Sequence, residues 1–189
     1  LFVAAQNLFG YSQIADLAKS IISLMFGIEL IGALLSWPIF AADYGWWKGL
    51  GYACFHAVSA FNNAGFDILG GTDSLAAYAS NIPMNLVTTG LVILGSFGFI
   101  AMIDLLHNRF KWRPLLLSTK ISIMMTAILL VLGTVLLKFN SDMTWMQAWF
   151  QSVIARTAGF GTVSLASVRQ AGLMVFVILM FIGANPNST

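Results

Sequence analysis

The chain has 189 residues, of which 59% are hydrophobic and only 8% are charged. A water-soluble domain of this length could not cover its surface with polar groups at that composition, so the sequence predicts a membrane protein surrounded by the lipid bilayer. The net charge of +2 comes from scattered basic residues, which excludes the concentrated basic face of a nucleic-acid-binding protein.

The lengths of the apolar runs distinguish helices that could cross a bilayer, which need roughly 20 residues, from shorter ones. After a segment at residues 1–17, the runs of spanning or nearly spanning length are Ala18–Trp37, Met84–Leu106 and Ile121–Leu137, and Leu173–Gly183 begins another. Between them, Lys48–Ala60 and Thr144–Ala155 are too short to cross and favour re-entrant or interfacial helices. Because the last run is cut short and the chain begins without methionine, we expect a piece of a longer protein.

The two short runs are followed by similar sequences. Ser59–Phe66 reads SAFNNAGF and Ile154–Gly161 reads IARTAGFG, so both contain Ala-Gly-Phe. Backbone that follows a half-helix must be buried in protein or line water, because unsatisfied amides and carbonyls are costly in hydrocarbon. The predicted fold is therefore an all-α integral membrane protein with repeated helix–re-entrant pore loop–helix units, a potassium-channel-like architecture most often used for ion-conducting pores.

The predicted units follow one another along the chain. The first covers residues 18–106, with a pore helix at about 48–60 and a filter at 61–66. The second covers 121–189, with a pore helix at about 144–155, a filter at 156–161 and a truncated last helix. The link at 107–120 carries four basic residues, so the positive-inside rule predicts that it and segment 1–17 are cytoplasmic. Both re-entrant loops would then enter from the outer face.

A pore loop has to dehydrate a cation without a net loss of coordination. Backbone carbonyls that point at the axis can replace the hydration shell, and glycine allows the left-handed backbone angles that this requires. Gly65 and Gly159 are the candidates in the two loops. Each preceding half-helix would direct its C-terminal end, which carries roughly −0.5 of an elementary charge, toward the ion.

The loop sequences resemble those of a known family. FHAVSAFNNAGFDILGG (Phe55–Gly71) and QSVIARTAGFGTVSLA (Gln151–Ala166) are similar to the second and third pore loops of the Trk/Ktr/HKT potassium-transporter superfamily, closest to the Ktr-type (KtrB-like) membrane subunit. The resemblance spans nearly the whole chain. It implies four units around one pore in a single polypeptide, of which this chain would hold the second and an incomplete third.

The resemblance also implies roles for individual residues. One glycine in each loop would set the potassium filter together with its neighbours, and the full set is Asn62, Asn63, Ala64, Gly65, Thr157, Ala158 and Gly159. The tail resembles an inner helix that breaks into an intramembrane gate, formed here by Gly183, Ala184, Asn185, Pro186, Asn187, Ser188 and Thr189. Asn185 and Asn187 depart from the family pattern, which has smaller residues there.

Substrate and partners likewise follow from the resemblance. Potassium would be the substrate and the only metal ion involved, with no covalent cofactor, and no local motif indicates coupling to sodium or protons. The implied assembly is a homodimer of membrane subunits docked on a cytoplasmic nucleotide-binding regulatory subunit, in the cell membrane. Its function would be potassium uptake.

Three polar residues inside apolar segments need separate interpretation. Glu29 lies in the middle of a predicted span, where an ionisable group is a functional candidate by default, although a structural hydrogen bond is the preferred reading. Arg156 adjoins the second filter and is interpreted as a brace that pairs with Asp67, because a bare guanidinium in the pore would repel the ion. His56 is expected to be packed and hydrogen-bonded.

Two other function classes are weaker alternatives. An intramembrane enzyme would need metal-ligand or triad spacing, which is missing from the polar candidates Glu29, Cys54, His56, Asp67 and His107. A secondary transporter of another monovalent cation or small solute also places the ends of half-helices at its substrate. Such transporters usually break the spanning helices themselves, whereas complete spans are expected beside each half-helix here.

Overall fold

The computed structural model describes residues 11–68, 75–155 and 170–182. All regular secondary structure in these ranges is helical, which confirms the all-α class for this part of the chain. The elements are α2 (Tyr11–Tyr44), α3 (Trp46–Phe61), the 3₁₀ turn η1 (Ala76–Tyr78), α4 (Ile82–Ser96), α5 (Phe99–His107), α6 (Leu117–Asn140), α7 (Trp145–Ile154) and α8 (Gln170–Ile182).

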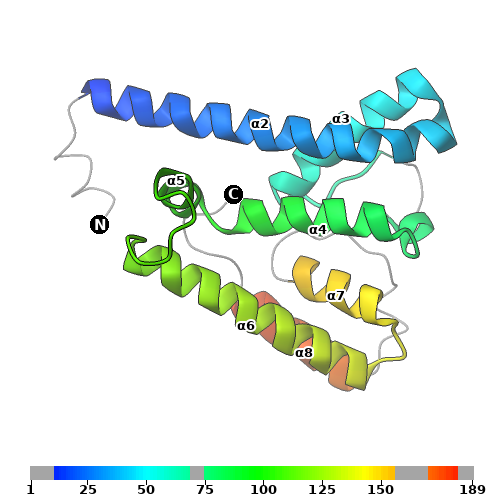
Figure 1. Ribbon diagram of the computed structural model, residues 1–189. Coiled ribbons are helices and arrows are strands. Elements are labelled where there is room, and N and C mark those ends of the chain that lie inside the picture. The colour runs from blue at the N-terminus through cyan, green and yellow to red at the C-terminus, as the bar shows by residue number, and fades with distance from the viewer. Residues whose placement is uncertain (1–10, 69–74, 156–169, 183–189) are drawn as a thin grey trace.

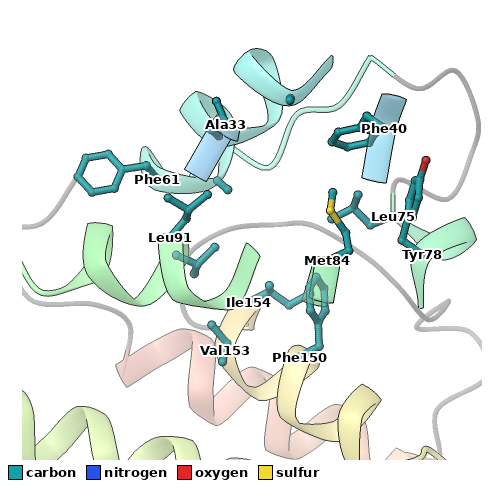
Figure 2. Packing of buried hydrophobic residues seen from close by; sticks show 14 of the residues in the cluster. Ala33, Phe40, Phe61, Leu75, Tyr78, Met84, Leu91, Phe150, Val153 and Ile154 are labelled. Carbon is teal, nitrogen blue, oxygen red and sulfur yellow. The ribbon is translucent and has the colours of Figure 1, made fainter. Parts of the chain in front are cut away.

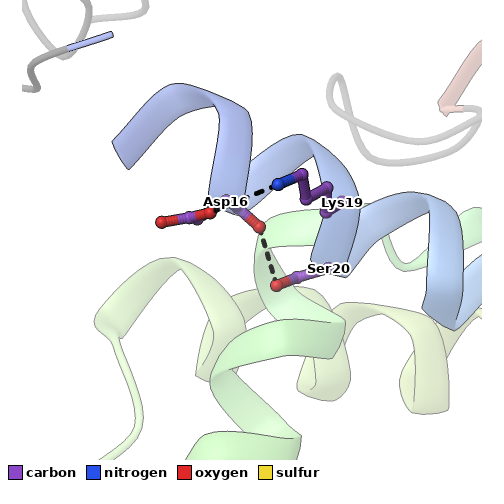
Figure 3. A network of polar contacts seen from close by, with 3 residues as sticks. All are labelled: Asp16, Lys19 and Ser20. Atoms are coloured by element: carbon purple, nitrogen blue, oxygen red, sulfur yellow. Dashed lines mark hydrogen bonds and ion pairs between the residues drawn. The ribbon is translucent and has the colours of Figure 1, made fainter. Parts of the chain in front are cut away.

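Two helices, α2 over Ala15–Tyr44 and α6, are long and apolar enough to cross a membrane. Their outward surfaces are apolar, with Phe26, Leu30, Val131 and Phe139 at least 60% exposed. Large apolar side chains can remain exposed in this way where they face lipid instead of water. At the start of α2, Lys19 pairs with Asp16 at 3.9 Å, and the Ser20 hydroxyl donates to the Asp16 carbonyl (Figure 3). These polar residues lie at the N-terminal end of the apolar part of α2.

Each long helix is followed at once by a short one. α3 turns back along α2 after Gly45, whose φ of +82° is accessible mainly to glycine. The two helices meet closely at Gly49, where an added Cβ would lie 2.6 Å from the Ala41 backbone. Trp37 closes the corner, because its indole nitrogen donates to the Trp46 carbonyl at 3.1 Å. α7 begins with a capping box in which Thr144 and Gln147 exchange side-chain and backbone hydrogen bonds.

The apolar run Met84–Leu106, expected as one span, is not a continuous helix. α4 ends at Ser96, α5 begins at Phe99, and the two are bent by 98°. Gly98 has a φ of +83°, far from the helical value of about −63°, so the ladder of helical hydrogen bonds is interrupted there. With this pair counted as one span, the described residues contain up to three spanning segments.

The core lies where α2, α3, α4 and α7 meet. α4 and α7 lie between α2 and α6, with α8 packed against α6 (Figure 1). On α3, the small residues Ala53, Ala57 and Ala60 are fully buried and share one helical face. Figure 2 shows Met84 and Leu91 of α4 near Phe150 and Val153 of α7, within the same buried cluster. This cluster places the C-terminal end of α3 beside α4, where the candidate site lies.

Candidate functional site

The candidate site is the loop that follows α3, defined here as Asn62–Phe66 and called the first loop. Two of its residues have left-handed backbone, Asn63 with a φ of 51° and Gly65 with a φ of 71°. Asparagine tolerates this region better than most residues, and glycine adopts it freely. The Asn-Asn-Ala-Gly sequence therefore suits a backbone that leaves the helical path immediately after α3.

Hydrogen bonds hold the first loop against the end of α3. The Ser59 hydroxyl donates to the Phe66 carbonyl at 2.6 Å, and the Ala64 amide donates to the Ser59 carbonyl at 2.9 Å. The Asn62 amide donates to the Val58 carbonyl at 3.0 Å. Ser59 thus contacts both ends of the segment that contains Gly65, and the loop folds back on its helix.

A second anchor comes from α2. The Asn62 side chain donates from Nδ2 to Glu29 Oε1 at 2.8 Å, and Glu29 is buried. Glu29 therefore makes a hydrogen bond, as preferred on sequence grounds. Its partner is a residue of the predicted filter, which makes this bond a direct connection between a membrane-length helix and the first loop.

The α4 helix also packs against the end of α3 and the first loop. A Cβ added at Gly95 would collide with the Phe61 carbonyl oxygen and would lie 3.0 Å from Asn63 Nδ2. Glycine at this position is therefore required by the approach of the end of α3. At Gly90, one turn and a half earlier on α4, an added Cβ meets nothing within 4 Å.

Polar side chains of α4 connect α3 and α7 within the core. His56 Nε2 and Thr88 Oγ1 are 2.9 Å apart and buried, which confirms the packed, hydrogen-bonded role expected for His56. Trp149 Nε1 of α7 donates to Thr89 Oγ1 at 3.4 Å. Both threonines also donate to their own helix, Thr88 to Met84 and Thr89 to Asn85, at 2.8 Å. These contacts fix α3 relative to the neighbouring helices, and therefore fix where the first loop begins.

Several predicted site residues lie outside the described ranges. These are Arg156, Thr157, Ala158, Gly159 and the tail residues Gly183–Thr189. Asp67, the predicted partner of Arg156, is half-buried just after the first loop. The second predicted filter therefore stays a prediction, as does the Arg156–Asp67 brace. In α7, the helix before the second predicted filter, Ser152 is buried and its hydroxyl donates to the Leu130 carbonyl of α6 at 3.2 Å.

Sequence reasoning missed two contributors to the site. Ser59 stands at the start of the repeated motif, and its spacing from Asn62, about one helical turn, is the signal that places it beside the loop. Thr88 could not be found from the sequence, because a threonine in an apolar helix gives no local signal beyond its polarity. Among the described residues, no group of three or more metal-ligating side chains is present.

The fold and the composition together define a multi-pass, all-α membrane protein. The chain matches the cation transport protein family TrkH over residues 9–139 and 114–189, and it belongs to this Trk/Ktr family. The family resemblance of the loop sequences is thereby confirmed.

Curated relatives agree with this assignment. The chain is 35% identical to the potassium/sodium uptake protein NtpJ of Enterococcus hirae, over 98% of the chain and 43% of that protein. It is also 35% identical to the Ktr system potassium uptake protein B of Vibrio alginolyticus, over 92% of the chain and 40% of that protein. The match to protein B of Bacillus subtilis is 35% over 93% of the chain and 42% of that protein. The chain thus spans roughly two fifths of the length of these relatives.

Proposed function

We propose that the chain is part of the ion-translocating subunit of a Trk/Ktr-type system, which takes up potassium across the cell membrane through a central pore. The observation that carries the proposal is the first loop. It follows a helix too short to span a bilayer, has left-handed backbone at Asn63 and Gly65, and is anchored at Ser59 and Glu29. The names of the relatives, potassium uptake and potassium/sodium uptake proteins, support potassium as the substrate.

The proposed mechanism needs no covalent chemistry. Carbonyl oxygens of the filter replace the water shell of the ion, and the negative C-terminal end of α3 favours a cation at the loop. The same role is proposed for Thr157, Ala158 and Gly159 after α7, since their sequence repeats that of the first loop. Gly183–Thr189 are proposed as a gate, because Pro186 within a continuous helix would cost about 3 kcal/mol.

The proposed assembly extends beyond the chain. The names of the relatives place two of them in a Ktr system, which is consistent with a membrane subunit that works with other components. We propose a homodimer with a cytoplasmic nucleotide-binding regulatory subunit. Copurification of the full-length protein with its system components, followed by a mass measurement of the complex, would test this.

A second candidate function is supported by the break between α4 and α5. A secondary transporter with broken helices would use such an interruption at its substrate site, and Gly98 bends this segment by 98°. The pore remains the better proposal, because the Ala-Gly-Phe repeat falls after α3 and α7 and not at the break.

The two candidates are separated by potassium uptake of the full-length protein in cells that lack their own uptake systems. The pore proposal predicts growth at low external potassium, and loss of this growth when the first-loop glycine is replaced. Growth that depends on Gly98 but not on Gly65 would favour the broken-helix transporter. Absence of growth at low external potassium, with normal growth at high potassium and the protein present in the membrane, would contradict potassium uptake.

The proposed orientation can be tested by cysteine labelling. The link between α5 and α6 carries Arg109, Lys111, Arg113 and Lys120 and is proposed to be cytoplasmic. In the full-length protein with its native cysteines replaced, we expect Lys111→Cys to react with a membrane-impermeant reagent only after permeabilisation. Ser80→Cys, before α4, should react from outside; both positions are exposed. Labelling of both from the same side would contradict the orientation.

A further inference from the structure

A carboxyl group lies in the middle of α2, the first of the membrane-length helices. Glu29 is only 8% exposed, and apolar residues surround it along the helix. An ionisable side chain at such a position is expensive in a bilayer, and it persists mainly where it serves the protein's function. The identity of its hydrogen-bond partner therefore indicates what that function is.

That partner is the first residue of the first loop. Asn62 Nδ2 donates to Glu29 Oε1 at 2.8 Å and to the Val58 carbonyl at 2.9 Å. An amide nitrogen carries two hydrogens, so these two bonds use the full donor capacity of the Asn62 side chain. The side chain is therefore held between α2 and α3, directly before the left-handed backbone of Asn63.

The Glu29 anchor differs in kind from the Ser59 anchor. Ser59 belongs to α3, so its bond to the Phe66 carbonyl fixes the loop only relative to its own helix. Glu29 belongs to α2, so its bond fixes the start of the loop relative to a second helix, one long enough to cross a membrane. Loss of the Glu29 bond would leave the loop attached to α3 but would remove its direct hydrogen bond to α2.

We propose that Glu29 is a positioning residue for ion selectivity. Through Asn62, it fixes where the Asn63–Gly65 backbone begins, and thereby how tightly the filter discriminates potassium from sodium. Discrimination requires the coordinating groups to be held close to their working geometry by the residues behind them. This inference rests on the proposed function of the chain as part of a potassium pore.

The test measures the ratio of potassium to sodium uptake, at matched membrane levels of the full-length protein. We expect Glu29→Met, which removes the acceptor at similar length, to lower the ratio at least tenfold, equivalent to about 1.4 kcal/mol. Glu29→Gln keeps an acceptor oxygen and should retain a ratio close to that of the unmodified protein. Ser36→Ala is the matched control, since Ser36 is a buried polar residue of α2 that donates to the Gly32 carbonyl of its own helix.

A double substitution separates positioning from general damage. If the two residues act through their bond, adding Glu29→Met to an Asn62→Ala variant should lower the ratio no further. A full additional tenfold loss in the double variant would overturn the proposal. A loss in Glu29→Gln equal to that in Glu29→Met would also overturn it, because charge and not the hydrogen bond would then be responsible.

The proposed function can fail separately from this inference. Gly65→Ser serves as the reference for a damaged filter in the same assay. If Gly65→Ser changes the ratio but Glu29→Met does not, the inference about Glu29 is wrong and the pore stands. If neither changes it, both the filter and the positioning role are rejected. Where Glu29→Met fails to reach the membrane, Asn62→Ala alone removes the same bond from the loop side, and an unchanged ratio in that variant overturns the inference.

Discussion

Replacing Gly65 with serine is expected to raise the potassium concentration for half-maximal uptake at least tenfold, while the protein still reaches the membrane. Gly65 has a φ of 71°, where a residue with a Cβ is disfavoured by roughly 1–2 kcal/mol. The loop would relieve this strain by rotating the peptide, which turns the carbonyl away from the ion. A tenfold loss of affinity corresponds to about 1.4 kcal/mol, so the strain is sufficient.

The matched control for this substitution is Gly90→Ser. Gly90 lies on α4 with nothing within 4 Å of an added Cβ, so serine fits there without displacement. Gly133 is unsuitable as a control, because its added Cβ would collide with the Ser152 hydroxyl. Gly159→Ser is expected to behave like Gly65→Ser, since the Ala-Gly-Phe sequence is repeated there. Equal uptake kinetics in Gly65→Ser and Gly90→Ser would contradict the role assigned to Gly65.

Replacing Gly95 with alanine is expected to damage both stability and transport. The added methyl group would collide with the Phe61 carbonyl oxygen, which belongs to the backbone and can move only with the end of α3. Overpacking of this kind typically costs about 1–3 kcal/mol. We expect a lower thermal unfolding temperature in detergent and a marked fall in potassium uptake.

Gly90→Ala provides the control for Gly95→Ala on the same helix. Because its Cβ meets open space and alanine is the better helix former by up to about 1 kcal/mol, this variant should be as stable as the unmodified protein or slightly more so. If both variants unfold at the same temperature, the close contact between α4 and the end of α3 does not exist in the protein.

The lengths of the apolar runs and the types of residue in the loops were enough to predict the short helices and the first loop. The short apolar run at 48–60 falls within α3, and the run at 144–155 corresponds to α7, because a half-helix is recognisable from its length and its flanking polar residues. Asn63 and Gly65 were identifiable as loop residues, since asparagine and glycine are the residues that adopt left-handed backbone most readily.

The features that sequence reasoning missed depend on three-dimensional contacts or on a single backbone angle. The run Met84–Leu106 is apolar on both sides of Gly98. Hydropathy therefore did not indicate that this glycine takes a positive φ and divides the run into two helices. Glu29 and Asn62 lie 33 positions apart, and nothing local indicates that α2 brings them together. The fit of Gly95 against the Phe61 carbonyl is likewise a property of the packing between α3 and α4.

The central claim, that the first loop forms part of a potassium filter, is tested most directly by ion binding to the purified full-length protein. Potassium and sodium are titrated separately in detergent by calorimetry, for the unmodified protein and for Gly65→Ser. We predict that the unmodified protein binds potassium more tightly than sodium, and that Gly65→Ser loses at least tenfold in potassium affinity. Unchanged potassium affinity and preference in a folded Gly65→Ser protein would contradict the claim.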